Sequence, residues 1–338
     1  MSGQTTYLAV QATAPGKLEL TRKPLQQPPA GFVRVKVEAC GVCHSDAATV
    51  EGVLPIEWPR VPGHEVVGKI DVVGEFVEGW SVGQRVGVGF LAGSCGHCKQ
   101  CRGGHLVNCE NQEFTGVQHD GGYAEYIIAK ASGLVLVPDE LSDVAAAPLL
   151  CAGLTTFGAL RNSDARAGDL VAVIGIGGLG HLAVQYARHM GYEVVAVGRK
   201  AEVADLARQL GAHHYINSAE ENVADALQTL GGADLVLATA SGGKAVAEAV
   251  KGLKPRGQIV VLGASPDPIE VASNDLFFDG KSIKGSLTGD PLTGDATLRF
   301  SALSGINAIV EEMPLERAPE AYAKMMAGKA RFRIVLTM

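Results

Sequence analysis

The sequence lacks long basic runs and long apolar segments. No stretch approaches about eighteen uninterrupted apolar residues, the length that a membrane-spanning helix needs. The opening MSGQTTYLAVQA has none of the basic residues, apolar core or cleavage site of a secretory signal. The net charge of −7 argues against a surface for nucleic acid or anionic membrane, because either would need basic side chains to bind phosphate. We therefore expect a cytoplasmic protein that binds neither.

Cysteine is informative, with seven in 338 residues. The run GSCGHCKQCRGGHLVNC holds four of them, Cys95, Cys98, Cys101 and Cys109. Thiolates at this spacing can close on one tetrahedral metal ion, and four sulfurs leave no open position, so the run predicts a structural Zn²⁺ site. A ferredoxin-type iron–sulfur run begins similarly, but its next cysteine follows after about three residues and precedes proline. Here the last cysteine follows after seven residues and precedes Glu110. Free cysteines on a loop are the remaining alternative.

The other three cysteines are Cys40, Cys43 and Cys151. Cys43 lies in GVCHSD, upstream of a GHE segment that contains His64, and Cys151 lies far along the chain in LLCAGLTTF. Two thiolates and one imidazole form the Cys₂His set of a catalytic zinc, which keeps its fourth position open. Sequence spacing alone does not bring three distant residues together. A buried structural Cys43, a core His64 and a small apolar Cys151 in a helix remain alternative interpretations.

The length exceeds what one hydrophobic core usually supports, so we expect two domains. A hydrophobic content of 47% with 43 glycines fits a large α/β enzyme rich in tight turns. FVRVKVEACGV alternates polar and apolar residues as a half-buried strand does, and VVGKIDVVGEFVEGWSVGQRVGV adds strands joined by glycine turns. DVAAAPLLCAGLTTFGAL is typical of a helix, and we place the crossover between the domains there.

DLVAVIGIGGLGHLAVQYARHMGYEVVAVG predicts a buried strand, a glycine-rich turn, a helix and a second apolar strand. The turn consists of Gly175, Gly177, Gly178, Leu179 and Gly180. Such a turn lets the backbone reach a pyrophosphate, which the helix N-terminus stabilises. A glycine turn without a ligand is the alternative. Four later apolar runs, HHYIN, ADLVLAT, GQIVVLG and SIKGSL, bring the total to six strands of a doubly wound sheet.

The end of the second strand, EVVAVGRKAE, bears on cofactor choice. A carboxylate there would hydrogen-bond the adenosine ribose of NAD, but Gly198 occupies this position, and Arg199 and Lys200 follow it. Without the carboxylate there is room for a 2′-phosphate, which guanidinium and ammonium groups bind. We therefore favour NADP over NAD. In the alternative, Arg199 stacks on adenine or faces solvent, and the protein accepts either cofactor.

Five segments follow one another in an order and spacing that resembles the zinc-dependent alcohol dehydrogenases of the medium-chain dehydrogenase/reductase superfamily. They are GVCHSD, VPGHEVVGKI, the four-cysteine lobe, LLCAGLTTF and VIGIGGLGHLAVQYA. The resemblance covers essentially the whole chain. It implies an α/β protein with a β-rich GroES-like catalytic domain at 1–152, completed by 289–338, and a doubly wound Rossmann cofactor domain at 153–288.

The resemblance also implies two Zn²⁺ ions per chain. The catalytic ion would be held by Cys43, His64 and Cys151, and the structural ion by Cys95, Cys98, Cys101 and Cys109. Cys40 would then be the spare cysteine, packed as a small hydrophobe.

A proton relay beside the catalytic metal follows from the same resemblance. Ser45 matches the hydroxyl that accepts the alcohol proton, and His44 would lie near the cofactor phosphates or the relay. Family members often carry a histidine three positions after the relay hydroxyl, where this chain has Ala48. The relay would therefore end at water, at a ribose hydroxyl or at His44. An ordinary loop cap is the alternative role for Ser45.

Four further positions match family residues around the metal and the cofactor. Asp46 matches a carboxylate that orients the His64 ring by accepting its other N–H, and Glu65 matches an acid behind the zinc. Thr155 matches a residue that packs on the nicotinamide face. Arg333 matches an arginine against the cofactor pyrophosphate, with a solvated surface arginine as the alternative.

The substrate pocket is expected to be lined by Trp58 and Phe90, although both aromatic residues could be plain core. Close relatives often carry tryptophan at the position of Phe90, so the predicted pocket is somewhat wider. The implied activity is that of an alcohol dehydrogenase that interconverts primary or secondary alcohols and the matching carbonyls. An NADPH-dependent reductase of aromatic, cinnamyl-type aldehydes and a non-catalytic, zinc-stapled dinucleotide-binding protein are the alternatives. Relatives are dimers or tetramers, so we expect a homo-oligomer, with the sheet edge from GQIVVLG to SIKGSL as a seam.

Overall fold

The computed structural model describes residues 5–240 and 242–338, and the chain forms two compact units. The first unit contains residues 1–154 and 289–338, and the second contains 155–288. The C-terminal segment thus returns to the first unit. The first boundary, at Leu154, lies two residues beyond the 152 that the family resemblance implies.

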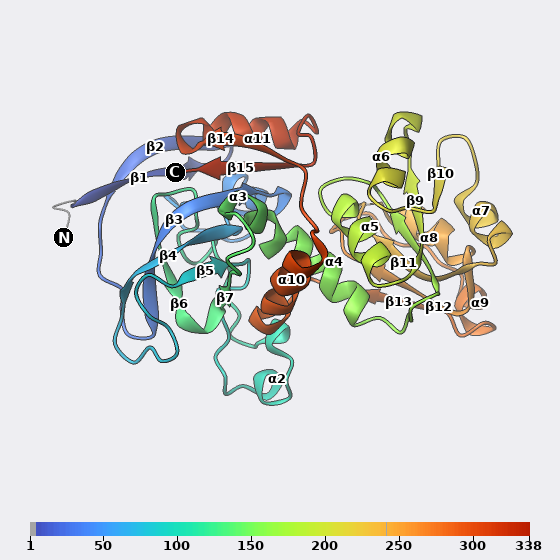
Figure 1. Ribbon diagram of the computed structural model, residues 1–338, viewed down its shortest axis with the longest axis horizontal. Helices are drawn as coiled ribbons and strands as arrows, with labels where there is room; N and C mark the ends of the chain where they lie inside the picture. Colours follow the sequence, from blue (N-terminus) through green and yellow to red (C-terminus); the bar gives the residue numbers. More distant parts are fainter. Residues whose placement is uncertain (1–4, 241) are drawn as a thin grey trace. The chain divides into compact units, whose positions relative to one another are not determined.

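Strands dominate the first unit (Figure 1). They are β1 (Thr6–Ala14), β2 (Lys17–Pro24), β3 (Phe32–Val42), β4 (Val66–Val73), β5 (Arg85–Val88), β6 (Tyr126–Lys130), β7 (Leu134–Leu136), β14 (Val310–Pro314) and β15 (Arg333–Thr337). Seven form one sheet in the order β14-β15-β3-β4-β5-β7, with β6 also paired to β3, while β1 and β2 form a separate antiparallel pair. The β-rich first domain that the sequence predicts is confirmed.

The strand β3 positions the first candidate metal ligand. Val33 and Val35 lie in the core of this unit, and the strand ends at Val42, directly before Cys43. β15 pairs with β3 in antiparallel register, with Ile334 opposite Val42. Strand pairing therefore carries the C-terminal segment to the residues beside Cys43.

The second unit is built on six parallel strands in the order β10-β9-β8-β11-β12-β13. Their bounds are β8 (Leu170–Ile174), β9 (Glu193–Gly198), β10 (His214–Asn217), β11 (Ala233–Ala238), β12 (Leu253–Val261) and β13 (Ser282–Gly285). Helices cover both faces of this sheet (Figure 1): α5 (Gly180–His189), α6 (Ala204–Gln209), α7 (Val223–Thr229), α8 (Gly243–Val250) and α9 (Ser273–Phe277). The predicted doubly wound sheet of six strands is confirmed. Its strands can be apolar on both faces because the crossover helices bury them from both sides.

The predicted continuous helix around Cys151 is wrong. The segment is interrupted: α3 (Asp143–Ala146) leads into a 3₁₀ turn at 147–150, and α4 (Ala152–Arg161) begins after Cys151. Cys151 itself has φ −128° and ψ −72°, outside helical geometry, and the two halves meet at 56°. Pro148 lacks an N–H and cannot extend a regular α-helix through this point. The break leaves Cys151 at a corner instead of on a helix face.

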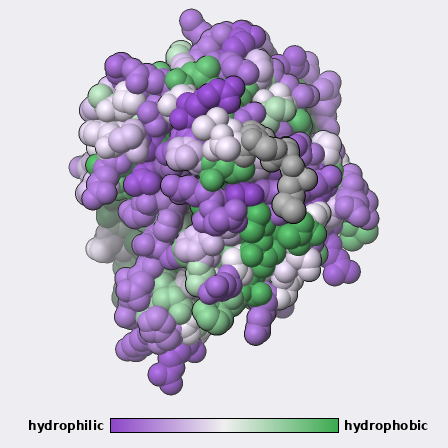
Figure 2. Space-filling model, turned by 90° about the vertical axis from the view of Figure 1, so that its left-hand side faces the viewer, coloured by the Kyte–Doolittle hydropathy of each residue, from purple (hydrophilic) through white to green (hydrophobic). Residues whose placement is uncertain are grey.

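The remaining helices all belong to the first unit. They are α1 (Ala47–Val50), α2 (Lys99–Arg102), α10 (Pro291–Ser304) and α11 (Ala318–Met326). Among the described residues no single helix is long and apolar enough to cross a membrane; the bent pair 143–150 and 152–161 meets that criterion only when its halves are taken together. The face drawn in Figure 2 is largely hydrophilic, with separate apolar patches.

The cap of α10 gives a test of how the C-terminal segment is anchored. The Asp290 carboxylate accepts hydrogen bonds from the Thr293 N–H at 2.8 Å and from its hydroxyl at 2.7 Å. We expect Asp290→Ala to lower the free energy of unfolding by about 1 kcal/mol, because a helix N–H loses its acceptor. Urea unfolding followed by circular dichroism measures this, with Asp290→Asn as the matched control that keeps a capping oxygen. Equal losses in both variants would contradict the capping role.

Candidate active site

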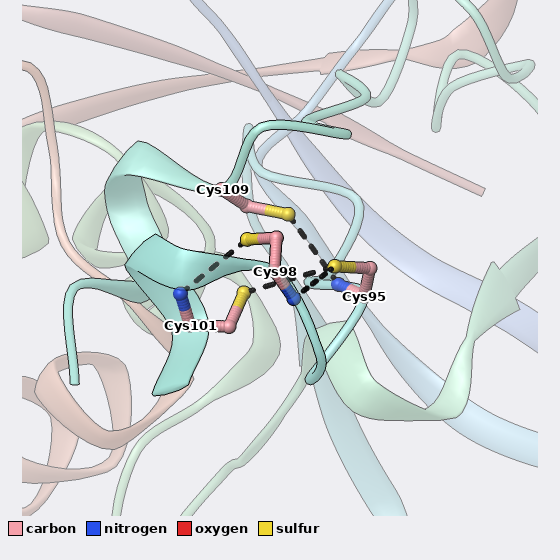
Figure 3. A group of neighbouring side chains, drawn as sticks. All are labelled: Cys95, Cys98, Cys101 and Cys109. Carbon is pink, nitrogen blue, oxygen red and sulfur yellow. Dashed lines mark hydrogen bonds between the residues drawn. The ribbon is translucent and has the colours of Figure 1, made fainter. Parts of the chain in front are cut away.

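The four cysteines of the predicted zinc lobe lie together around α2 (Figure 3). Cys98 caps this helix, and its sulfur accepts the Cys101 N–H at 3.4 Å. The Cys95 sulfur accepts the Cys98 N–H at 3.4 Å, and the Cys109 sulfur accepts the Cys95 N–H at 3.4 Å. All four sulfurs lie within 4.8 Å of one another. This arrangement fits one tetrahedrally coordinated ion.

The lobe has few apolar side chains of its own, so a bound metal would stabilise it more than hydrophobic packing does. Its core is small, consisting of the cysteines with Leu106 beside them. The Asn111 side chain and nearby backbone N–H groups lower the pKa of Cys95 to about 5, so this sulfur is readily a thiolate. None of the seven cysteines forms a disulfide in the part of the chain that the structure describes. A bound cation would therefore supply much of the folding energy of this lobe.

A second cluster brings three distant segments together. Cys43 follows β3, His64 and Glu65 precede β4, and Cys151 lies at the break before α4; one ligand atom from each lies within 4.8 Å of all the others. The sulfurs of Cys43 and Cys151 are 3.8 Å apart. The structure thus assembles the Cys₂His set that the sequence alone could not bring together. The hydrogen bond from the Cys151 thiol, helped by His64, lowers the pKa of Cys43 despite its burial.

The imidazole of His64 is oriented as a metal ligand. The ring is 1% exposed, and its Nδ1 lies 2.9 Å from Oδ1 of Asp46. The other carboxylate oxygen of Asp46 accepts the Cys43 N–H at 2.9 Å and the Tyr123 hydroxyl at 2.8 Å. Nε2 of His64 is buried and has no hydrogen-bond partner among the residues that the structure describes. A buried ring nitrogen without a partner is costly unless it binds something, and together with the two thiols beside it this nitrogen could hold a metal ion.

A buried ion pair lies next to these ligands. Glu65 is fully buried, and one of its oxygens pairs with the guanidinium of Arg333 on β15. No described residue forms a hydrogen bond with the second oxygen of Glu65. Burial raises the pKa of Glu65 to about 7, although Arg333 opposes this shift. A Cβ at Gly41 would lie 1.8 Å from the Glu65 carboxylate, so only glycine fits at this point of GVCHSD.

The burial of Arg333 decides one alternative. The residue is 5% exposed, so it is not a solvated surface arginine. Its contact with the cofactor pyrophosphate remains a prediction.

The relay candidates lie on a short turn after Cys43. His44 and Ser45 are exposed on the 3₁₀ turn at 44–46, and Ala48 follows on α1. Ser45 is two residues from a ligand, and its exposure places the hydroxyl within reach of solvent.

Aromatic side chains cover one side of His64. The Phe90 ring meets the His64 ring edge-on, with 5.0 Å between centroids, and stacks on Phe114 at 4.7 Å. Trp58 is half-buried, and its indole N–H donates to the Thr49 carbonyl at 3.2 Å. Phe90 is therefore at the metal set, whereas the Trp58 contacts are with the segment after Cys43.

The glycine-rich turn between β8 and α5 has the geometry of a phosphate cradle. Gly175 adopts φ +92°, which favours glycine, and a Cβ at Gly180 would lie 1.8 Å from the Gly175 carbonyl oxygen. Around Gly177 nothing lies within 4 Å of a built Cβ, so the turn is open where a ligand would approach. Thr239 holds the turn by donating to the carbonyls of Ile174 and Gly175 at 3.0 and 2.7 Å.

The residues that bear on cofactor choice follow β9. Gly198 is buried at the end of the strand, and the side chains of Arg199 and Lys200 are exposed after it. Thr155 is 4% exposed on α4, four residues after Cys151.

Comparisons with known proteins agree with this geometry. The family model described as Alcohol dehydrogenase GroES-like domain matches residues 29–139, and the model described as Zinc-binding dehydrogenase matches residues 178–302. The alcohol dehydrogenase notN of Aspergillus sp. (strain MF297-2) is 42% identical over 335 residues, which cover 99% of this chain and 98% of the relative. This chain belongs to the zinc-type medium-chain dehydrogenase/reductase family.

Solved structures of zinc-type dehydrogenases share the whole fold. A cinnamyl alcohol dehydrogenase from Sorghum bicolor has a TM-score of 0.89 and 29% identity, covering 98% of this chain and 97% of that one. An acetophenone reductase from Geotrichum candidum, in complex with NAD, has a TM-score of 0.86 and 30% identity, covering 100% and 99%. The predicted family, enzyme class and GroES-like plus Rossmann fold are therefore confirmed. The comparisons also support the predicted zinc and nicotinamide cofactor.

The structure adds three residues that the sequence did not predict: Tyr123, Phe114 and Thr239. Each acts through a contact with a distant segment, respectively Asp46, Phe90 and the glycine turn. No local motif marks them. Cys40, in contrast, packs fully buried in the core of the first unit, as predicted.

Removing one cysteine from each cluster separates the roles of the two sites. We expect Cys43→Ala to abolish turnover while the chain still folds, because the Cys₂His set loses one of its ligands. Cys98→Ala should chiefly lower the thermal midpoint, because the lobe has almost no apolar core of its own. Initial rates and thermal melts of both variants measure this. Normal rates in Cys43→Ala would show the catalytic assignment to be wrong.

The support of His64 gives a separate test. We expect Asp46→Asn to weaken zinc retention by about 10–100-fold, because the ring loses its charged partner. Tyr123→Phe removes only one hydrogen bond from Asp46 and should have a smaller effect in the same direction. Zinc remaining after titration with a chelator is the measurement. Wild-type retention in Asp46→Asn would contradict the orienting role.

Proposed function

We propose that this protein is a zinc-dependent alcohol dehydrogenase that interconverts primary or secondary alcohols and aldehydes or ketones, using NADP. The observation that carries the proposal is the buried His64 Nε2, which lies beside two thiols and has no hydrogen-bond partner within 5–240 and 242–338. We infer two zinc ions per chain, one for each cysteine cluster. A reducing, cytoplasmic compartment suits six ligand cysteines that must remain thiolates.

The residues around the Cys₂His set would divide the work of the reaction. Zinc, when bound, supplies a Lewis acid for the substrate oxygen, and the nicotinamide accepts or gives the hydride. Ser45 takes the alcohol proton. Ala48 stands where many relatives have the histidine that passes the proton onward, and Ser45 and His44 are exposed. The relay is therefore short and ends at water, at a ribose hydroxyl or at His44. Asp46 holds the ring of His64, and the buried carboxylate of Glu65 tunes the field at the metal.

A second candidate substrate class is supported by the aromatic pair Phe90 and Phe114. Phe90 meets the His64 ring edge-on, and Phe114 stacks on Phe90. This aromatic pair would suit aromatic aldehydes of the cinnamyl type. Faster turnover of an aromatic aldehyde with NADPH than of any alcohol with NADP would favour this reductase. Trp58 is a weaker candidate for the same pocket.

A non-catalytic dinucleotide-binding protein is disfavoured. It would require a disabled Cys43, His64 or Cys151, and the structure brings all three together. One zinc per chain in place of two would support it.

We infer a homo-oligomer, a dimer or tetramer, formed through the edge strand β13. This strand pairs only with β12 among the described strands, and Phe277 and Phe278 on the preceding segment are 77% and 78% exposed. Exposed aromatic side chains beside an open edge favour a second copy as the partner. The small-molecule substrate is the other partner proposed.

Cofactor preference is testable at the end of β9. We expect wild-type kcat/KM to favour NADP over NAD, and Arg199→Ala with Lys200→Ala to lower it for NADP by about 10–100-fold, because charged hydrogen bonds to the 2′-phosphate are lost. NAD should be little affected, which makes it the internal control. Initial rates with short-chain, branched and benzylic alcohols measure both quantities. Equal losses with the two cofactors would contradict 2′-phosphate recognition.

A further inference from the structure

Tyr215 lies beneath the cofactor-selecting residues. It belongs to β10, the edge strand beside β9 (Figure 1). In the pairing of these strands, Asn217 of β10 is opposite Gly198 of β9. The Tyr215 hydroxyl donates to the Lys200 carbonyl oxygen at 2.7 Å. A side chain of β10 therefore reaches under the loop that carries Arg199 and Lys200.

The hydroxyl of Tyr215 also fills the space in which a side chain at position 198 would begin. A Cβ built on Gly198 would lie 2.4 Å from this oxygen and 3.2 Å from Cζ of the same ring. Gly198 is not among the glycines with positive φ, so its backbone would accept any residue. The obstacle to a carboxylate at this position is thus Tyr215 and not the backbone.

The obstacle is held in place from two sides. Moving the ring would break the hydrogen bond to Lys200. Moving the strand end would break two others, because the Gly198 carbonyl accepts the Ser218 N–H at 2.8 Å and the Ser218 hydroxyl at 3.1 Å. A side chain introduced at position 198 must therefore displace the Tyr215 hydroxyl and break its hydrogen bond to Lys200. This would weaken cofactor binding by the loop of Arg199 and Lys200.

We propose that Tyr215 is a specificity-determining positioning residue: it keeps position 198 free of a side chain and fixes the loop of Arg199 and Lys200 for a 2′-phosphorylated adenosine. The assignment rests on the proposed NADP function. It also means that Gly198→Asp alone cannot convert the site to one that binds the ribose 2′-hydroxyl of NAD.

Calorimetry of the full-length protein with 2′,5′-ADP and 5′-AMP tests this, because these ligands probe the adenosine end without turnover. The variants are Gly198→Asp, Tyr215→Phe and the double variant. Tyr215→Phe removes the hydroxyl that would lie 2.4 Å from a Cβ at position 198. It leaves the ring carbon Cζ, which would lie 3.2 Å from that Cβ. Gly285→Ala, at a strand end where a Cβ meets nothing within 4 Å, is the control for adding a side chain.

We expect wild type to bind 2′,5′-ADP more tightly than 5′-AMP, and Gly198→Asp alone to weaken both. The double variant should bind 5′-AMP about tenfold more tightly than Gly198→Asp, and this coupling should be missing when Gly285→Ala is combined with Tyr215→Phe. If wild type binds both ligands equally, the proposed NADP function fails. If wild type prefers 2′,5′-ADP but Gly198→Asp binds 5′-AMP as well as the double variant does, only the role of Tyr215 is overturned.

Discussion

The constraint on which the rest of this structure depends is a buried imidazole nitrogen beside two thiols, for which the described part of the chain provides no hydrogen-bond partner. Burying His64, Cys43 and Cys151 without a cation would leave polar atoms unsatisfied in the core. The sequence around them serves this arrangement. Asp46 fixes the ring, Tyr123 fixes Asp46, and the break before α4 turns Cys151 toward the other two ligands.

The two cysteine clusters use the same ligand chemistry for different ends. In the lobe around α2, four sulfurs lie together within one short segment, so a bound ion would take the place of a hydrophobic core. In the second cluster, Cys43, His64 and Cys151 come from three segments of a well-packed unit, and a Cys₂His shell would leave a position open for substrate. The Glu65–Arg333 pair can lie beside it because β15 pairs with β3, so the C-terminal segment completes the catalytic unit.

Sequence patterns predicted those features of the structure that depend on residues close together in the chain. The glycine turn, the cysteine spacing and the apolar strand runs each encode their geometry within a few residues. Contacts between distant segments were beyond that reach: Arg333 on Glu65, Tyr123 on Asp46 and Tyr215 under Gly198. The helix predicted through Cys151 failed for a related reason, because tertiary packing and Pro148 outweigh the helix propensity of alanine and leucine.

Zinc K-edge X-ray absorption on the purified protein, combined with its zinc content, tests the central claim most directly. Two zinc ions per chain with an average shell of about three sulfurs at about 2.3 Å and one nitrogen or oxygen at about 2.0–2.2 Å are predicted. A single zinc per chain with about four sulfurs would contradict the account, because it would leave Cys43, His64 and Cys151 without the cation that their burial requires.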